Sequence, residues 1–150
     1  MLYMILIGAS VFTYFVTLAH MPEALLASID ALHLSPLGVI ALLLVAYIVL
    51  GTVFEELSAI MITLPFVLPV VIHAGYDPVW WGVMNVIQAE LALIHPPFGV
   101  IVFLLHGLAP DIPMRRIYRG VVPFLIADFA VLILLTLFPG LALWLPHLLN

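Results

Sequence analysis

Hydrophobic runs that match the thickness of a lipid bilayer are the feature that most constrains the fold of this chain. Residues 1–19 contain no acidic or basic side chain, and residues 121–138 contain only Asp128. Each run is close to the roughly 20 residues that cross the hydrocarbon core as a helix. Acidic and basic residues make up 7% of the chain, against about 25% in a typical soluble domain. Because lipid-facing positions favour apolar side chains, we predict an all-α integral membrane protein.

The composition also excludes several classes of function. The chain has arginine but no lysine, and its formal net charge of −5 does not suggest nucleic-acid binding. It has no cysteine, which excludes disulfides and cysteine-based metal sites. No His-Glu-x-x-His, Gly-x-Ser-x-Gly or P-loop motif is present. We therefore expect no enzyme activity and no cofactor, and we expect an ion gradient or a partner chain to drive any transport.

Periodicity and helix-breaking residues divide the chain into five elements. Residues 1–19 form a spanning helix that is retained, because no basic segment precedes it and no small-x-small cleavage site follows it. In residues 22–34, Leu25, Ile29 and Leu32 recur at helical spacing, which favours an amphipathic helix at the membrane surface over a simple loop. The five elements lie at 1–19, 22–34, 36–73, 78–109 and 118–139, and together they form one transmembrane domain over residues 1–150.

The third element, at 36–73, is interrupted by Gly51, Glu55 and Glu56. A carboxylate in hydrocarbon costs about 2.5–3.5 kcal/mol on insertion scales. The pair is tolerable where the helix is broken and the break faces protein or water. Because each arm has about 15 residues, too few for a full crossing, we predict a re-entrant helical hairpin. Glu55 either contributes to a cation site at the hairpin tip, or both glutamates cap the N-terminus of the second arm.

The fourth element, at 78–109, is interrupted at His95, Pro96, Pro97 and Gly99. Two consecutive prolines cannot sit inside a regular helix, because each lacks a backbone donor and clashes with the preceding turn. The sequence therefore predicts a broken helix. Glu90 and His95 either form an acid–base pair within the membrane, or Glu90 is hydrogen-bonded in the protein interior while His95 caps a helix end.

Two interrupted hydrophobic segments in one short chain are typical of the binding site of a secondary transporter. Helix N-termini at such breaks carry free N–H groups and partial positive charge, which suit an anionic solute. Unwound carbonyls and helix C-termini suit Na⁺. The candidate ion- or substrate-binding residues are therefore Gly51, Glu55, Glu90, His95, Pro96, Pro97 and Gly99, with Na⁺ expected at Gly51 and Glu55.

The basic residues predict the orientation of the chain. Arg115, Arg116 and Arg119 all lie in residues 109–119, which are expected to form a loop before the last spanning helix. By the positive-inside rule this loop is cytoplasmic. The C-terminus is then periplasmic, the N-terminus is cytoplasmic, and the hairpin enters the membrane from the external side.

Several motifs in their order along the chain resemble the large permease subunit of TRAP-type (tripartite ATP-independent periplasmic) transporters. They are GTVFEELSAIMITLPFVLPVV, GYDPVWWGV, HPPFG, IYRGVVPF and FPGLALWLP, and the resemblance covers roughly residues 37–146. It implies inverted repeats in an elevator-type fold in the bacterial inner membrane, of which this chain is the C-terminal repeat. It also implies Na⁺-driven import of organic acids or related small solutes. The implied partners are an N-terminal repeat, a small membrane subunit and a periplasmic solute-binding protein.

The candidate residues match the family motifs with some departures. Gly51 and Glu55 match a Gly-x-x-x-acid hairpin tip at which the family usually has Asp. The proline pair and Gly99 match a motif that usually reads Thr-Pro-Pro-x-Gly, with His95 in place of Thr and Ala92 in place of a common Gly. Further matches are Pro65, Pro69, Asp77, Pro78 and Gly82.

The histidine in place of threonine leaves two functions open. A threonine hydroxyl is a suitable Na⁺ ligand, whereas a protonated imidazole repels the ion. His95 is therefore compatible with altered ion use, an altered substrate or lost activity. The first function is a TRAP-type permease component, and the alternative is a non-transporting membrane subunit or an inactive gene fragment of such a permease.

Overall fold

The computed structural model describes residues 2–51, 54, 56–95 and 99–149, and every regular element among them is an α-helix. The all-α prediction is therefore confirmed. The helices are α1 (Leu2–Leu18), α2 (Met21–Ala31), α3 (Pro36–Gly51), α4 (Glu56–His73), α5 (Pro78–Ile94), α6 (Val100–Leu108), α7 (Met114–Leu137) and α8 (Gly140–Leu149).

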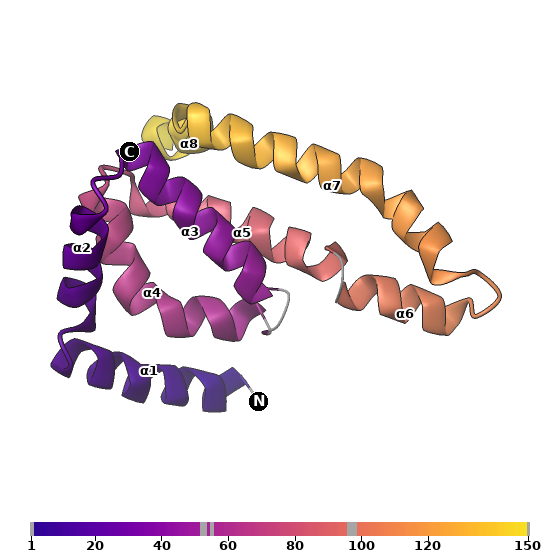
Figure 1. The fold of residues 1–150 in the computed structure, drawn as a ribbon, viewed down its shortest axis with the longest axis horizontal. Coiled ribbons are helices and arrows are strands. Elements are labelled where there is room, and N and C mark those ends of the chain that lie inside the picture. The colour runs from indigo at the N-terminus through magenta and orange to yellow at the C-terminus, as the bar shows by residue number, and fades with distance from the viewer. Residues whose placement is uncertain (1, 52–53, 55, 96–98, 150) are drawn as a thin grey trace.

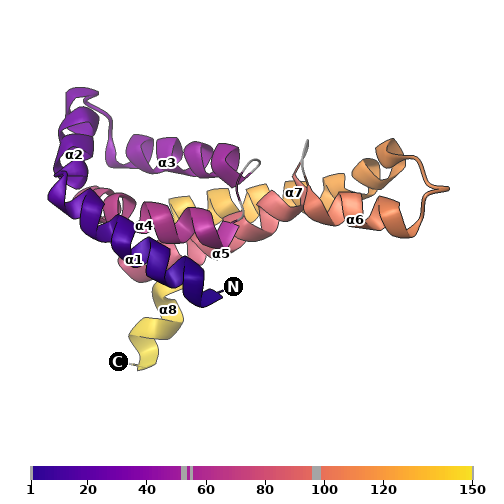
Figure 2. The same cartoon turned by 90° about the horizontal axis from the view of Figure 1, so that it is seen from below.

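The helices form an elongated arrangement in which α5 and α6 follow one another along the longest dimension (Figure 1). Helix α7 runs back beside both of them, α3 and α4 form a V-shaped antiparallel pair, and α1 lies along α4. Helix α8 turns away from the other helices (Figure 2). The buried core lies where α3, α4 and α5 meet, and it contains Ile40, Leu43, Tyr47, Val67, Val70, Val71, Trp80, Trp81, Met84 and Leu91.

The turn between α4 and α5 has its geometry set by the local sequence. Gly75 adopts a positive φ of 85°. Its N–H donates to Ile72 O at 2.9 Å, and the N–H of Tyr76 donates to Val71 O at 3.1 Å. This pattern is the Schellman ending of a helix, which favours glycine at the left-handed position. Asp77 then caps α5 by accepting a hydrogen bond from the N–H of Val79 at 2.7 Å.

Trp80 connects the start of α5 to the end of α7. Its side chain is fully buried, at 0% exposure. Its Nε1–H donates to Leu135 O at 2.9 Å. In a regular helix the N–H of residue 139 would donate to this carbonyl, but Pro139 has no N–H. The indole therefore supplies the donor that the chain lacks at the end of α7.

The helix lengths bear on which elements could cross a bilayer. Within the described part of the chain, α7 is the one helix with the length and apolar composition to cross a bilayer by itself. Helices α1 and α2 meet the same criteria together, as a pair bent by 62°. Helix α3, the stretch Ser58–His73 and α5 are apolar but shorter. The re-entrant placement of α3 and α4 and the elevator-type fold stay predictions.

Helix α7 begins earlier than the sequence suggested. It starts at Met114, whereas the last element was expected at 118–139. Pro113 stands immediately before the helix with φ −64° and ψ 137°, and Pro113 O accepts a hydrogen bond from the N–H of Arg116 at 2.7 Å. As a result, the three arginines lie in the first two turns of α7 instead of in the preceding loop.

We predict that Trp80→Phe destabilises the protein by about 1–3 kcal/mol, because it leaves Leu135 O without a donor in a partly buried position. Trp144 is 64% exposed, so Trp144→Phe is the matched control and should change stability by less than about 0.5 kcal/mol. Thermal unfolding of both variants in detergent measures the difference. Equal melting temperatures for the two variants would contradict the assigned role of the indole.

Candidate functional site

The first interruption separates the two arms of the antiparallel pair. Helix α3 ends at Gly51, which is half-buried, and α4 begins at Glu56. Between them the N–H of Phe54 donates to Leu50 O at 2.8 Å. Glu55 lies outside the described residues. A helix C-terminus and a helix N-terminus therefore meet at this interruption.

A polar contact holds the two arms together about one turn before Gly51. The hydroxyls of Tyr47 on α3 and Thr63 on α4 are hydrogen-bonded to each other. Thr63 Oγ1 donates its own hydrogen to Ala59 O at 2.7 Å, so the Tyr47 hydroxyl is the donor to Thr63. The Tyr47 ring also packs edge-on against Trp81 of α5, with ring centroids 5.5 Å apart. Helices α3, α4 and α5 are thus joined close to the first interruption.

Two buried amides extend this polar contact along α5. Gln88 Nε2 donates to Leu44 O of α3 at 3.0 Å, and Asn85 Nδ2 donates to Trp81 O at 3.0 Å. Gln88 and Asn85 are 2% and 4% exposed, and their side-chain oxygens have no hydrogen-bond partner among the described residues. An unpartnered buried acceptor costs about 1–3 kcal/mol. Such a cost makes these oxygens functional candidates that the sequence analysis did not single out.

The spacing of these residues contained a signal for their burial. Trp81, Asn85 and Gln88 are separated by four and then three residues, so they share one face of α5. A polar pair in register with a tryptophan inside an apolar helix points toward the protein interior, not toward lipid.

The second interruption begins at His95, which ends α5 with an extended backbone at φ −73° and ψ 133°. Its N–H donates to Leu91 O at 2.9 Å. Its ring lies edge-on to Phe129 of α7, with centroids 6.3 Å apart. His95 Nδ1 is buried and has no partner among the described residues. Pro96 and Pro97 lie outside the described residues.

Gly99 resumes the chain after the second interruption and is buried. A Cβ atom at this position would lie 2.9 Å from the carbonyl carbon of Ile94 and 3.0 Å from its oxygen. The end of α5 and the start of α6 are therefore in direct contact. Gly99 O accepts from the N–H groups of Val102 and Phe103, which begins α6. Glycine is required here for steric reasons, because a side chain at position 99 would overlap the backbone at the end of α5.

Glu90 faces a groove of about 330 Å³ between α5, α6 and α7. The groove also contains Asp128, the one acidic residue of the apolar run 121–138. Glu90 is exposed and Asp128 is half-buried. Five residues of helix leave about 140° of rotation between Glu90 and His95, and no hydrogen bond joins them in the part of the chain described. The groove is lined by Glu90, Leu93, Ile94, Ile101, Val121, Phe124 and Asp128.

The interruptions provide chemistry for binding a solute or an ion. At each, a helix N-terminus follows a helix C-terminus after a few residues, and these are the ends at which carbonyls and N–H groups lack a partner within the helix. The buried oxygens of Asn85 and Gln88 add further acceptors on α5. Within the described residues, no group of three or more His, Asp or Glu side chains is placed to hold a metal ion.

Comparison with known proteins shows which family this chain resembles. A family model described as "Tripartite ATP-independent periplasmic transporter, DctM component" matches residues 1–141. The chain is 32% identical over 145 residues to the sialic acid TRAP transporter large permease protein SiaM of Vibrio cholerae, covering 97% of this chain and 34% of that protein.

Two further relatives also match nearly all of this chain over about a third of their own length. The chain is 29% identical to the C4-dicarboxylate TRAP transporter large permease protein DctM of Vibrio cholerae, over 99% of this chain and 33% of that protein. It is also 29% identical to the ectoine/5-hydroxyectoine TRAP transporter large permease protein UehC of Ruegeria pomeroyi, over 96% of this chain and 34% of that protein. The chain therefore spans about a third of the length of these relatives, which are transporter permeases and not enzymes.

We predict that Gly99→Ala destabilises the protein by about 1–3 kcal/mol or more, because the added methyl group overlaps the backbone of Ile94. Gly82→Ala is the matched control. A Cβ atom at Gly82 meets nothing within 4 Å, and alanine favours the helix by about 0.5–1 kcal/mol. Thermal unfolding in detergent measures the effect. Gly99→Ala should have a lower melting temperature than the unchanged chain, and Gly82→Ala should not. A Gly99→Ala variant as stable as the original chain would show that the two helix ends are not in contact.

Proposed function

Because the chain belongs to the DctM-component family of tripartite ATP-independent periplasmic transporters, we propose that it provides ion- and solute-binding elements of a secondary importer of small organic anions. The family consists of integral inner-membrane proteins, and its members transport organic acids and other small solutes. The observation that carries the proposal is the pair of interrupted helices, each with a helix C-terminus beside a helix N-terminus.

An anionic solute fits the helix N-termini at the interruptions. Helix α4 begins at Glu56 and α6 begins at Val100, and both directly follow an interruption. The free N–H groups and partial positive charge at such ends favour carboxylates. Two of the relatives are named for sialic acid and C4-dicarboxylates, which carry carboxylates. This chemistry supports an organic acid as the solute.

A coupling cation fits the opposite ends of the same helices. The C-terminal carbonyls of α3 and α5 carry partial negative charge, which suits Na⁺. We assign Gly51 and Glu55 to this ion, with Na⁺ as the coupling ion. Glu90 and Asp128 place two further carboxylates in the groove beside the second interruption.

The arrangement in the membrane follows the same proposal. Helices α3 and α4 form a re-entrant hairpin in one inverted repeat of an elevator-type fold. The arginine-bearing start of α7 faces the cytoplasm, and the C-terminus is periplasmic. The other parts of the permease, a small membrane subunit and a periplasmic solute-binding protein are the proposed partners.

His95 favours a second candidate function. The family motif usually has threonine at this position, and an imidazole cannot replace a neutral hydroxyl as a Na⁺ ligand when it is protonated. The chain could then be a non-transporting membrane subunit or an inactive fragment of a permease.

Uptake into proteoliposomes distinguishes the two functions. The chain is reconstituted with the other permease parts, the small subunit and the binding protein, and an inward Na⁺ gradient is imposed. Radiolabelled succinate and N-acetylneuraminate are tested in separate vesicles. We expect one of them to accumulate in a Na⁺-dependent manner, and Glu55→Gln to weaken that dependence without preventing insertion. Uptake equal to that of vesicles lacking the chain would support the non-transporting subunit or fragment.

We predict that His95→Thr lowers the Na⁺ concentration needed for half-maximal uptake, because a hydroxyl oxygen replaces an imidazole whose buried Nδ1 has no partner among the described residues. The measurement is initial uptake rate against external Na⁺. His95→Ala is the control, since it removes the imidazole without adding an oxygen ligand. If His95→Thr and His95→Ala behave alike, the hydroxyl at this position does not bind the ion.

A further inference from the structure

We propose that the start of α7 binds the headgroup of an anionic phospholipid, and that the lipid's acyl chain lies along the adjoining exposed face of the same helix. The surface is formed by Arg115, Arg119, Val122 and Ile126. It is separate from both helix interruptions.

The basic residues of the chain are all concentrated at this place. Arg115, Arg116 and Arg119 account for the full count of three lysines and arginines, and all three are exposed. The ion pairs recorded for the described residues join histidine to Glu23 or Asp30, and none includes an arginine. Asp111 in the preceding turn is the nearest acidic residue along the chain. The region therefore has an excess of positive charge that the described protein groups do not neutralise.

The helix itself adds to this excess. The N-terminus of α7 carries partial positive charge, and its first turn contains no acidic residue. Basic side chains in the first turn of a helix are unfavourable unless an anion offsets them. A phosphate diester is such an anion, and guanidinium groups bind it through paired hydrogen bonds.

An apolar surface of the right length continues from the arginines. Arg115, Arg119, Val122 and Ile126 follow one another at spacings of four, three and four residues, so they lie on one face of α7. Val122 and Ile126 are 46% and 64% exposed. The rise from Arg115 to Ile126 is about 16 Å, which is about half the thickness of the hydrocarbon core. A single lipid in one leaflet therefore matches this face, with its headgroup at the arginines.

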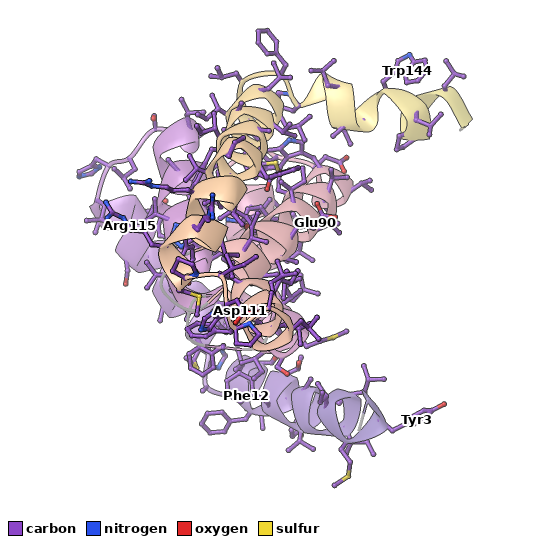
Figure 3. The ribbon with its side chains drawn as sticks, turned by 90° about the vertical axis from the view of Figure 1, so that its right-hand side faces the viewer. Tyr3, Phe12, Glu90, Asp111, Arg115 and Trp144 are labelled. Carbon is purple, nitrogen blue, oxygen red and sulfur yellow. The ribbon has the colours of Figure 1, made fainter. Side chains whose placement is uncertain are left out.

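The neighbouring residues border this face on the side of the core. Leu125 and Leu132 of α7 pack toward the core at about 80–100° of rotation from Arg115, and Phe129, which also packs there, is about 40° from it. Figure 3, which looks onto this end of the molecule, places Arg115 and Glu90 on opposite sides of α7. The carboxylate of Glu90 is thus directed away from the proposed headgroup position. Arg116 is rotated by about 100° from Arg115, away from Val122.

The rotation of Arg116 provides a matched control. Arg115→Gln and Arg116→Gln each remove one positive charge from adjacent positions, but only the first lies in line with the apolar face. The full chain is reconstituted into nanodiscs that contain equal amounts of phosphatidylglycerol and phosphatidylcholine. Native mass spectrometry then measures which lipid stays bound, with both membrane faces accessible so that orientation has no effect.

We predict that the unchanged chain retains phosphatidylglycerol over phosphatidylcholine, and that Arg115→Gln lowers this preference about tenfold, as expected for one charge-assisted hydrogen bond. Arg116→Gln should lower it by less than about twofold. Excess inorganic phosphate should leave the bound phosphatidylglycerol in place, because free phosphate does not use the apolar face. Circular dichroism confirms that both variants keep their helices.

Three outcomes would overturn the proposal. Equal retention of the two lipids by the unchanged chain would show that no anionic headgroup is recognised, and this comparison needs no variant. Equal losses in Arg115→Gln and Arg116→Gln would indicate general charge attraction instead of a site. Displacement of phosphatidylglycerol by inorganic phosphate would indicate an anion site without a lipid.

Discussion

The satisfaction of backbone hydrogen bonds is the constraint on which the rest of this structure depends. In an apolar environment an unpaired N–H or carbonyl costs several kcal/mol, so an apolar chain must form helices and must supply partners where they end. Leu135 shows this need most directly, because Pro139 cannot donate to its carbonyl and the indole of Trp80 does so at 2.9 Å. The Schellman ending at Gly75 and the cap at Asp77 meet the same need in the turn between α4 and α5.

The two interruptions are the places where regular helix pairing stops. At Gly51 and at His95 a helix stops inside an apolar segment and another begins a few residues later, so the ends at which backbone groups lack an intrahelical partner follow one another. The surrounding contacts hold these ends in place. Tyr47 and Thr63 join the two arms, Gln88 joins α5 to α3, and Gly99 lets α6 start against the end of α5. Rigid supports around adjoining helix ends are what a binding site for a small ion or solute requires.

Much of this could be predicted from the sequence, because the relevant signals are local. Hydropathy and proline positions predicted the helices, and the motifs around Gly51 and Pro96 indicated the family that the comparisons confirm. The start of α7 was expected later than Met114, since the arginines were interpreted as a loop. Asn85 and Gln88 were not among the predicted site residues, because their contact with α3 depends on which face of α5 meets that helix. The assignment of Gly51, Glu55 and His95 to a transported ion stays a prediction.

The sequence by itself determined that the chain is helical, where its helices break and which family it belongs to. These properties follow from hydropathy, from residues that cannot continue a helix and from short motifs, all of which act over a few neighbouring residues. Only the tertiary structure decided which distant groups meet: Trp80 with Leu135, Gln88 with Leu44, and Glu90 with Asp128 in one groove. Those pairings depend on the rotation and packing of whole helices, and an apolar helix that is hydrophobic on every side does not specify its own rotation.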